Sequence, residues 1–193
     1  MNGSIFSAAF FAICWMASAN AGDLVFKTID EETHRPLSGK EPAKAVVLIF
    51  TATDCPVANY FQPTIRRIAK RYEGKGVRFF QVYPDRDTDA ESAKKHAKEY
   101  EITTAQVLDP EQKLAGEAGA KKTPEAVVYN AAGEVVYRGR IDDTYAALGK
   151  KRARPTTADL KATLDAILGG KNPALKEVEA VGCFIFFEEH PPE

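Results

Sequence analysis

Two cysteines, Cys55 and Cys183, carry the most reactive side chains of this sequence. Cys55 follows the apolar run Ala45–Phe50, which is typical of a buried strand, and precedes Pro56, which opens a stretch with helical periodicity. A sulfur in the first turn of a helix lies beside unpaired amide N–H groups and the positive end of the helix dipole. Both lower a thiol pKa, by about one unit from about 8.5. The Asp54 carboxylate opposes this effect, so we predict a moderately reactive thiolate that is accessible from outside.

A thiolate at Cys55 can attack a disulfide and form a mixed disulfide, which a second thiol must then resolve. The position three residues after Cys55 is Ala58, so the chain has no C-x-x-C motif. Cys183 is the candidate for the second thiol, and Gly182 before it allows the backbone to bend or to approach another segment closely. Cys183 is therefore the candidate partner of Cys55, although the two cysteines lie far apart in the sequence.

Composition indicates one soluble globular domain: 193 residues, 45% hydrophobic and 27% charged. A net charge of −1 argues against nucleic acid as a partner. Residues 1–21 resemble a signal peptide cleaved after Ala21, although no Lys or Arg precedes the apolar run Ile5–Ala19. That run is shorter than the ~20 residues of a spanning helix, so we expect export to a periplasmic or extracellular space without stable membrane insertion. Cleavage removes Cys14 and leaves Cys55 and Cys183 where disulfides persist.

The order of elements predicted for the first half is strand, helix, strand, helix, which implies parallel strand pairs. Pro63 predicts a kink or a delayed start in the first helix. Thr88 and Glu91 form a possible capping box for the second helix. The predicted elements are strands at Leu24–Ile29, Ala45–Thr51, Val77–Tyr83 and Gln106–Leu108, and helices from Pro56 to about Tyr72, from Thr88 to about Tyr100, and from Asp109 to about Gly119.

The second half has a different pattern. Two β-prone runs, Glu125–Tyr129 and Glu134–Arg138, surround Gly133 and predict an antiparallel hairpin with this glycine in a left-handed conformation. Residues 141–154 lack periodicity and are predicted as a loop. A last helix is expected to begin at 155–159 and to end at 169–170. Residues 171–193 form a C-terminal extension that carries Cys183.

This order of elements, with a cysteine after the first main strand, resembles the thioredoxin fold. Thr123-Pro124-Glu125 adds to the resemblance, because it is similar to the cis-proline loop that faces the active-site cysteine in that family. The resemblance implies an α/β fold of three layers over residues 22–170, with a central mixed β-sheet flanked by helices. It also implies that Pro56, Thr123 and Pro124 bind the substrate.

Four segments together are similar to the redoxin branch that contains alkyl hydroperoxide reductases and thiol-specific antioxidant proteins: 54–56, 123–125, 137–143 and 182–183. In that branch one cysteine attacks and a distant cysteine resolves. The resemblance implies a thiol-disulfide oxidoreductase with Cys55 as the attacking thiolate and Cys183 as the resolving cysteine. Its substrate would be a protein or small-molecule disulfide or a peroxide. An external thiol would then reduce the oxidised protein, and no cofactor is implied.

Two positions differ from the peroxidases of that branch. Ala52 replaces the threonine that helps to bind peroxide, and Leu48 replaces a proline. A peroxiredoxin-like peroxidase is therefore the alternative rather than the first hypothesis. Arg140 could lower the pKa of Cys55 and contact substrate, or it could belong to the surface ion pairs of a strand end.

Two further hypotheses remain for the cysteine pair. A permanent disulfide between Cys55 and Cys183 would close a long loop and stabilise the fold by roughly 5 kcal/mol, with no redox role. Alternatively, both thiolates and one of His34, His96 or His190 could bind Cu(I). No ligand spacing supports a metal site, and His96, which follows two lysines, is expected on a solvated helix face.

Overall fold

The protein is described by a computed structural model that covers residues 24–38, 40–174 and 176–187. The predicted signal peptide and His190 lie outside these residues. A six-stranded mixed sheet forms the centre, with the strand order β11-β8-β7-β3-β4-β5. β3 is parallel to β4 and antiparallel to β7. The strands are β3 (Ala45–Phe50), β4 (Val77–Tyr83), β5 (Ala105–Leu108), β7 (Glu125–Asn130), β8 (Val135–Gly139) and β11 (Lys176–Val178).

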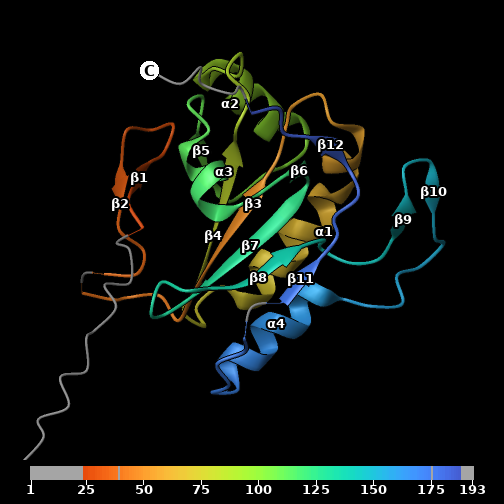
Figure 1. Cartoon of the computed structure of the whole chain (residues 1–193). Coiled ribbons are helices and arrows are strands. Elements are labelled where there is room, and N and C mark those ends of the chain that lie inside the picture. The colour runs from red at the N-terminus through yellow and green to blue at the C-terminus, as the bar shows by residue number, and fades with distance from the viewer. Residues whose placement is uncertain (1–23, 39, 175, 188–193) are drawn as a thin grey trace, which may run out of the picture.

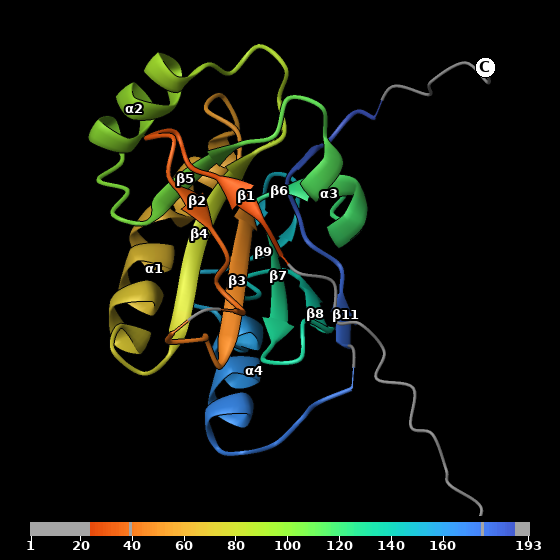
Figure 2. The same ribbon diagram turned by 90° about the vertical axis from the view of Figure 1, so that its left-hand side faces the viewer.

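Helices cover both faces of this sheet (Figure 1). On one face, α1 (Pro56–Tyr72) and α4 (Asp159–Leu168) pack their apolar sides against alternate residues of β3 and β7. On the other face lie α3 (Lys113–Ala118) and the small hairpin of β1 (Phe26–Lys27) and β2 (Thr33–His34). Figure 2 shows α2 (Ala90–Glu99) beyond one end of α1. The predicted three-layer arrangement with a mixed central sheet is confirmed.

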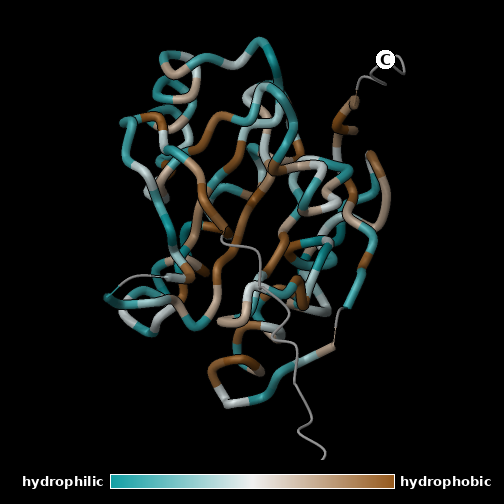
Figure 3. The backbone as a smooth tube through the Cα atoms, turned by 60° about the vertical axis from the view of Figure 1, so that its left-hand side comes forward, coloured by the Kyte–Doolittle hydropathy of each residue, from teal (hydrophilic) through white to brown (hydrophobic). Residues whose placement is uncertain are grey.

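The core is divided in two by the sheet because side chains of a strand alternate between its faces. Val47 and Ile49 of β3 point toward α1, whereas Val46, Leu48 and Phe50 pack toward α3 and the β1–β2 hairpin. All six residues of β3 are buried. Figure 3 shows the hydrophobic residues concentrated along the central strands. No helix among the described residues is long and apolar enough to cross a membrane.

The starts of two helices differ from the prediction. The N-cap of α2 is Asp89, which accepts a hydrogen bond from the Ser92 amide at 2.8 Å, and not Thr88, which is buried. α3 begins only at Lys113, because a turn intervenes between Asp109 and the helix. The Asp109 carboxylate accepts hydrogen bonds from the Leu114 and Ala115 amides across this turn. By contrast, α1 begins at Pro56 as predicted and continues through Pro63 without a delayed start.

Short strands also occur where the sequence predicts none. The segment predicted as a loop contains an antiparallel hairpin of β9 (Tyr145–Ala147) and β10 (Lys150–Lys151). The C-terminal extension adds β11 to the edge of the central sheet, parallel to β8. It then forms β12 (Cys183–Phe184), which pairs antiparallel with β6 (Lys122–Thr123). This last pair brings Cys183 to the cysteine that follows β3.

Candidate active site

Cys55 caps the N-terminus of α1, where the apolar strand β3 and a short turn deliver it. Its backbone is extended (φ −80°, ψ 109°), and its Sγ accepts a hydrogen bond from the Ala58 amide at 3.5 Å. Pro56 occupies the first position of the helix, where the missing N–H has no intrahelical partner to lose. The sulfur therefore lies at the positive end of the helix dipole, as predicted.

The segment Thr123–Pro124 faces this sulfur. Its peptide bond is cis, and the Cys55 thiol donates a hydrogen bond to the Thr123 carbonyl oxygen at 3.0 Å. The Thr123 hydroxyl is buried and has no other hydrogen-bond partner among the described residues, so it is free to donate to the sulfur when Cys55 ionises. The buried Glu125 carboxylate accepts bonds from the Lys121 and Lys122 amides and so fixes the shape of this segment.

Cys183 lies opposite Thr123 in the β6–β12 pair and within hydrogen-bonding reach of Cys55. Both cysteines are free thiols. The close approach depends on Gly182, because a Cβ atom there would lie 1.9 Å from the Thr123 carbonyl oxygen. The sequence interpretation of this glycine as a point of close backbone approach is confirmed, and the two distant cysteines are brought together.

The two thiols have opposite electrostatic environments. Burial alone would raise the pKa of Cys55, but hydrogen bonds from the Cys183 thiol, the Thr123 side chain and the Ala58 amide outweigh it and lower the pKa. For Cys183, burial, the hydrogen bond to Cys55 and the negative charges of Cys55 and Asp54 raise the pKa to about 12. The pair therefore holds its thiolate on Cys55 and its proton on Cys183.

The sulfur of Cys55 is not accessible in this structure, contrary to the prediction. Cys55 is 1% exposed, because the C-terminal segment around Cys183 lies over it. Beside this segment is a hollow of about 400 Å³, and Cys183, Thr123 and the exposed Asp54 are among the residues that line it. A substrate can approach from this hollow only if the covering segment moves.

A buried relay of hydrogen bonds supports the turn before Cys55. The Asn59 side chain donates to the Thr53 carbonyl at 3.0 Å and accepts from His96 Nε2 at 2.7 Å, so His96 Nδ1 accepts from the Tyr83 hydroxyl at 2.9 Å. His96 is 4% exposed, and the expectation of a solvated position for it was wrong. The relay ties α2 and β4 to the Cys55 turn.

Stability should depend on the protonation of His96. Burial lowers its pKa, so the unfolded chain takes up a proton near pH 6.5 while the folded chain does not. We expect the free energy of unfolding to decrease as the pH falls from about 6.5 to the lower folded pKa, because a protonated ring cannot accept from Tyr83. Denaturant titrations across this range measure the slope. The free energy of unfolding should change less with pH in His96→Gln. An equal pH dependence in the two proteins would refute the role given to His96.

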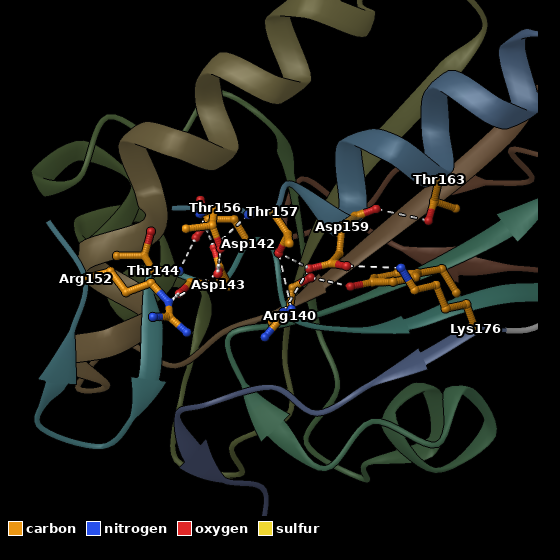
Figure 4. Close-up of polar contacts among 11 residues, drawn as sticks. Arg140, Asp142, Asp143, Thr144, Arg152, Thr156, Thr157, Asp159, Thr163 and Lys176 are labelled. Atoms are coloured by element: carbon orange, nitrogen blue, oxygen red, sulfur yellow. Dashed lines mark hydrogen bonds and ion pairs between the residues drawn. The ribbon is translucent and has the colours of Figure 1, made fainter. Parts of the chain in front are cut away.

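Arg140 belongs to a separate polar cluster at the start of α4 (Figure 4). Its guanidinium donates to Asp159 at 2.9 Å and to the Thr157 hydroxyl at 3.2 Å. Lys176 of β11 reaches the same carboxylate at 3.1 Å. The described contacts of the Arg140 side chain thus join the sheet edge to α4, and a role for Arg140 in substrate binding stays a prediction.

Asp143 anchors the neighbouring loop in the same cluster. It is 3% exposed and accepts hydrogen bonds from the amides of Thr156 and Thr157, at 2.6 and 2.9 Å. It also forms an ion pair with Arg152. At the base of the β9–β10 hairpin, Tyr145 packs against Phe61 of α1. Asp143 is therefore a buried anchor that holds the loop and the hairpin in place.

We expect Asp159→Asn to lower the free energy of unfolding by about 1–3 kcal/mol, because charged hydrogen bonds in the cluster are lost. Burial alone would raise the pKa of Asp159, but bonds from Arg140, Thr157 and Lys176 lower it. The stabilisation that the ionised Asp159 carboxylate provides is therefore present above about pH 4. It is lost as the pH falls through the lower pKa of the folded state. Denaturant unfolding checks both statements.

Asp30→Asn is the matched control, since Asp30 makes an exposed ion pair with Lys94 and should contribute under about 1 kcal/mol. Equal losses of stability in the two variants would contradict the buried role of Asp159.

The described residues contain no group of three or more His, Cys, Asp or Glu side chains that could hold a metal ion. His96 is used in the relay, and His34 packs near Phe26 and Phe80 on the opposite face of the sheet. Neither described histidine therefore joins the two cysteines in a copper site.

Comparisons with known proteins extend these observations. Residues 20–141 match the AhpC/TSA family. A hypothetical protein from Sinorhizobium meliloti is 25% identical, with a TM-score of 0.71 over 86% of this chain and 91% of its own. An uncharacterized conserved protein from Geobacillus kaustophilus is 26% identical, with a TM-score of 0.70 over 88% of this chain and 92% of its own.

A secreted disulfide oxidoreductase of Mycobacterium tuberculosis, homologous to E. coli DsbE, is 16% identical, with a TM-score of 0.52 over 79% of this chain and 98% of its own. At that identity the likeness concerns the fold alone, which is thioredoxin-like. No curated protein matches the chain.

Proposed function

The chain belongs to the AhpC/TSA family, and from this we propose that it is a thiol-disulfide oxidoreductase in which Cys55 attacks and Cys183 resolves. Family membership supports redoxin chemistry in general. The observation that carries the specific proposal is the juxtaposition of the two thiols, with Cys183 paired opposite Thr123 and in hydrogen-bonding reach of Cys55.

The reaction has two exchange steps. The Cys55 thiolate attacks one sulfur of a substrate disulfide, forms a mixed disulfide and releases the other sulfur as a thiolate. The Cys183 thiol then loses its proton and attacks Cys55 Sγ, which forms the Cys55–Cys183 disulfide and releases the second substrate thiol. The substrate gains two electrons and the protein loses two. An external dithiol returns them and completes the cycle.

Substrate binding is proposed for the segment around the attacking sulfur. Pro56 is exposed beside Cys55, and the backbone of Thr123 and Pro124 can hold an extended chain against it. An exported location, with the signal peptide cleaved after Ala21, would place this chemistry in an oxidising compartment. A protein disulfide is then the natural substrate class.

Peroxide reduction is the less favoured reaction. Ala52 offers no hydroxyl to a peroxide, and the Thr51 hydroxyl is buried and accepts from Gln62 at 3.4 Å. The Arg140 guanidinium is held by Asp159 and Thr157. Ala52 therefore removes the donor that the peroxidases of this branch have at this position, and the Thr51 and Arg140 side chains contact other groups.

Stoichiometric oxidation tests the proposal. The reduced protein is mixed with one equivalent of glutathione disulfide or hydrogen peroxide, and the loss of free Cys55 is followed by peptide mass mapping. We expect faster loss with the disulfide, ending in a Cys55–Cys183 bond, and no reaction of Cys55→Ser. Faster oxidation by peroxide would favour the peroxidase, and no reaction with either oxidant would leave an inert or metal-binding pair.

A further inference from the structure

The C-terminal segment 176–187, here called the strap, occupies a position that another chain could occupy. It leaves the sheet edge at β11 and crosses to β6, where Cys183 and Phe184 pair with Thr123 and Lys122. The Ile185 amide extends this ladder to the Lys121 carbonyl at 2.9 Å. Figure 1 shows this blue segment beside β6. The strap thereby uses the backbone groups of β6 that an added strand from a partner would need.

Two glycines make this docking possible. A Cβ atom at Gly139 would lie 1.9 Å from the Val178 carbonyl oxygen, and one at Gly182 would lie 1.9 Å from the Thr123 carbonyl oxygen. The strap is therefore seated by backbone contact at both of its strands. A single methyl group at either site would push it away.

The strap has few fully buried side chains, and its ion pair and side-chain hydrogen bonds are exposed. Lys122 pairs with Glu179, which is 85% exposed, and the Gln112 side chain donates to the Phe186 carbonyl at 2.8 Å. Phe184 and Phe186 are 61% and 82% exposed, although Ala180 and Ile185 are buried. Segments with few buried apolar contacts and exposed hydrogen bonds open at low free-energy cost.

We propose that the strap is a displaceable occupant of a docking site for an extended segment of a partner protein, so that partner binding and strap release are one exchange. This inference rests on the proposed function and adds how access to Cys55 is controlled. The strap covers the sulfur until a partner strand pairs with β6. After the first exchange step the strap competes with the partner segment for β6, and its return carries Cys183 to the mixed disulfide, where attack on Cys55 Sγ releases the partner.

The chemistry of the site defines the partner segment. It is extended, carries a disulfide sulfur opposite Thr123, and has an apolar residue where Ile185 is now buried. Asp54, Asp85 and Asp87 line the adjoining hollow, together with Arg86. The acidic excess favours a partner segment with lysine or arginine beside the disulfide.

Alkylation of Cys55 tests the proposal on the full chain. The rate with iodoacetamide is followed by peptide mass mapping, at a pH above the thiol titration so that ionisation does not limit it. If the released state is populated at about 0.1–10%, Gly182→Ala should raise this rate by on the order of tenfold to a thousandfold. The control is Gly116→Ala, since a Cβ atom there meets no atom within 4 Å, and its rate should match the unchanged chain.

A peptide with the sequence of residues 180–187, Cys183 replaced by serine and lysines added for solubility, should slow alkylation of the Gly182→Ala variant. A scrambled peptide should not. An unchanged rate in Gly182→Ala, or equal protection by both peptides, would overturn the proposal. These readouts need no disulfide exchange, so an unreactive disulfide substrate would count against the proposed function alone.

Discussion

Replacing Cys183 with alanine is expected to stop the reaction after its first step, with Cys55 held in a mixed disulfide. Ala58 occupies the position of a neighbouring second cysteine, so the described chain offers no other thiol for resolution. Turnover should fall to a single equivalent of substrate per chain. Mass mapping after mixing with a disulfide substrate should show the adduct on Cys55.

Cys183→Ser is the matched variant, since a hydroxyl cannot resolve the adduct but can still donate a hydrogen bond to Cys55. Both variants should accumulate the adduct, whereas the unchanged chain should release both substrate thiols. Continued turnover in Cys183→Ala would show that an external thiol resolves the adduct and that Cys183 is dispensable.

The electrostatics of the cysteine pair support the proposed order of the two steps. Burial, the hydrogen bond to Cys55 and the negative charges of Cys55 and Asp54 keep the pKa of Cys183 at about 12. Once Cys55 is in a mixed disulfide it has no charge, so two of these causes disappear. Cys183 therefore ionises more easily after Cys55 has reacted, and the resolving thiolate forms when it is needed.

The rate of attack by Cys55 should rise about tenfold per pH unit until its thiol titrates, below the ordinary cysteine value of about 8.5. Cys183→Ala removes a hydrogen bond to the thiolate, which shifts the whole profile to higher pH. The rate at neutral pH should fall roughly three- to tenfold, because a more basic thiolate is more nucleophilic and partly compensates.

Cys183→Ser retains a donor and should shift the profile less. Single-turnover rates with a disulfide probe, together with the ultraviolet absorbance of the thiolate, give both profiles. A profile unchanged in Cys183→Ala would mean that the Ala58 amide and the Thr123 hydroxyl suffice to hold the thiolate.

Local signals in the sequence were sufficient to place Cys55 at the start of the first long helix. An apolar run followed by Cys55 and Pro56 specifies a buried strand, a turn and a helix start, each within a few residues. The left-handed Gly133 of the β7–β8 hairpin, with φ 77°, follows from the same kind of local chemistry. The choice of Cys183 as the partner of Cys55 rested on the absence of a nearer cysteine and on the resemblance to redoxins, because no local pattern reports contacts over such a separation.

The elements that were missed are short or depend on tertiary contacts. β9, β10, β11 and β12 have only two or three residues each, too few to show a periodicity. The burial of His96 had a weak signal in Ala93 three residues earlier, which shares its inward face. Two preceding lysines hid that signal, and only the contacts with Tyr83 and Asn59 reveal the relay.

The reduction potential of the Cys55–Cys183 pair tests the mechanism most directly. The full chain is equilibrated in thiol–disulfide buffers of graded potential, quenched with acid, and the bridged fraction is measured by mass mapping. A redox-active pair should have a midpoint above about −300 mV, in the range of working oxidoreductases. A midpoint well below about −300 mV would identify a permanent structural bridge, and a pair that never forms the bridge would exclude resolution by Cys183.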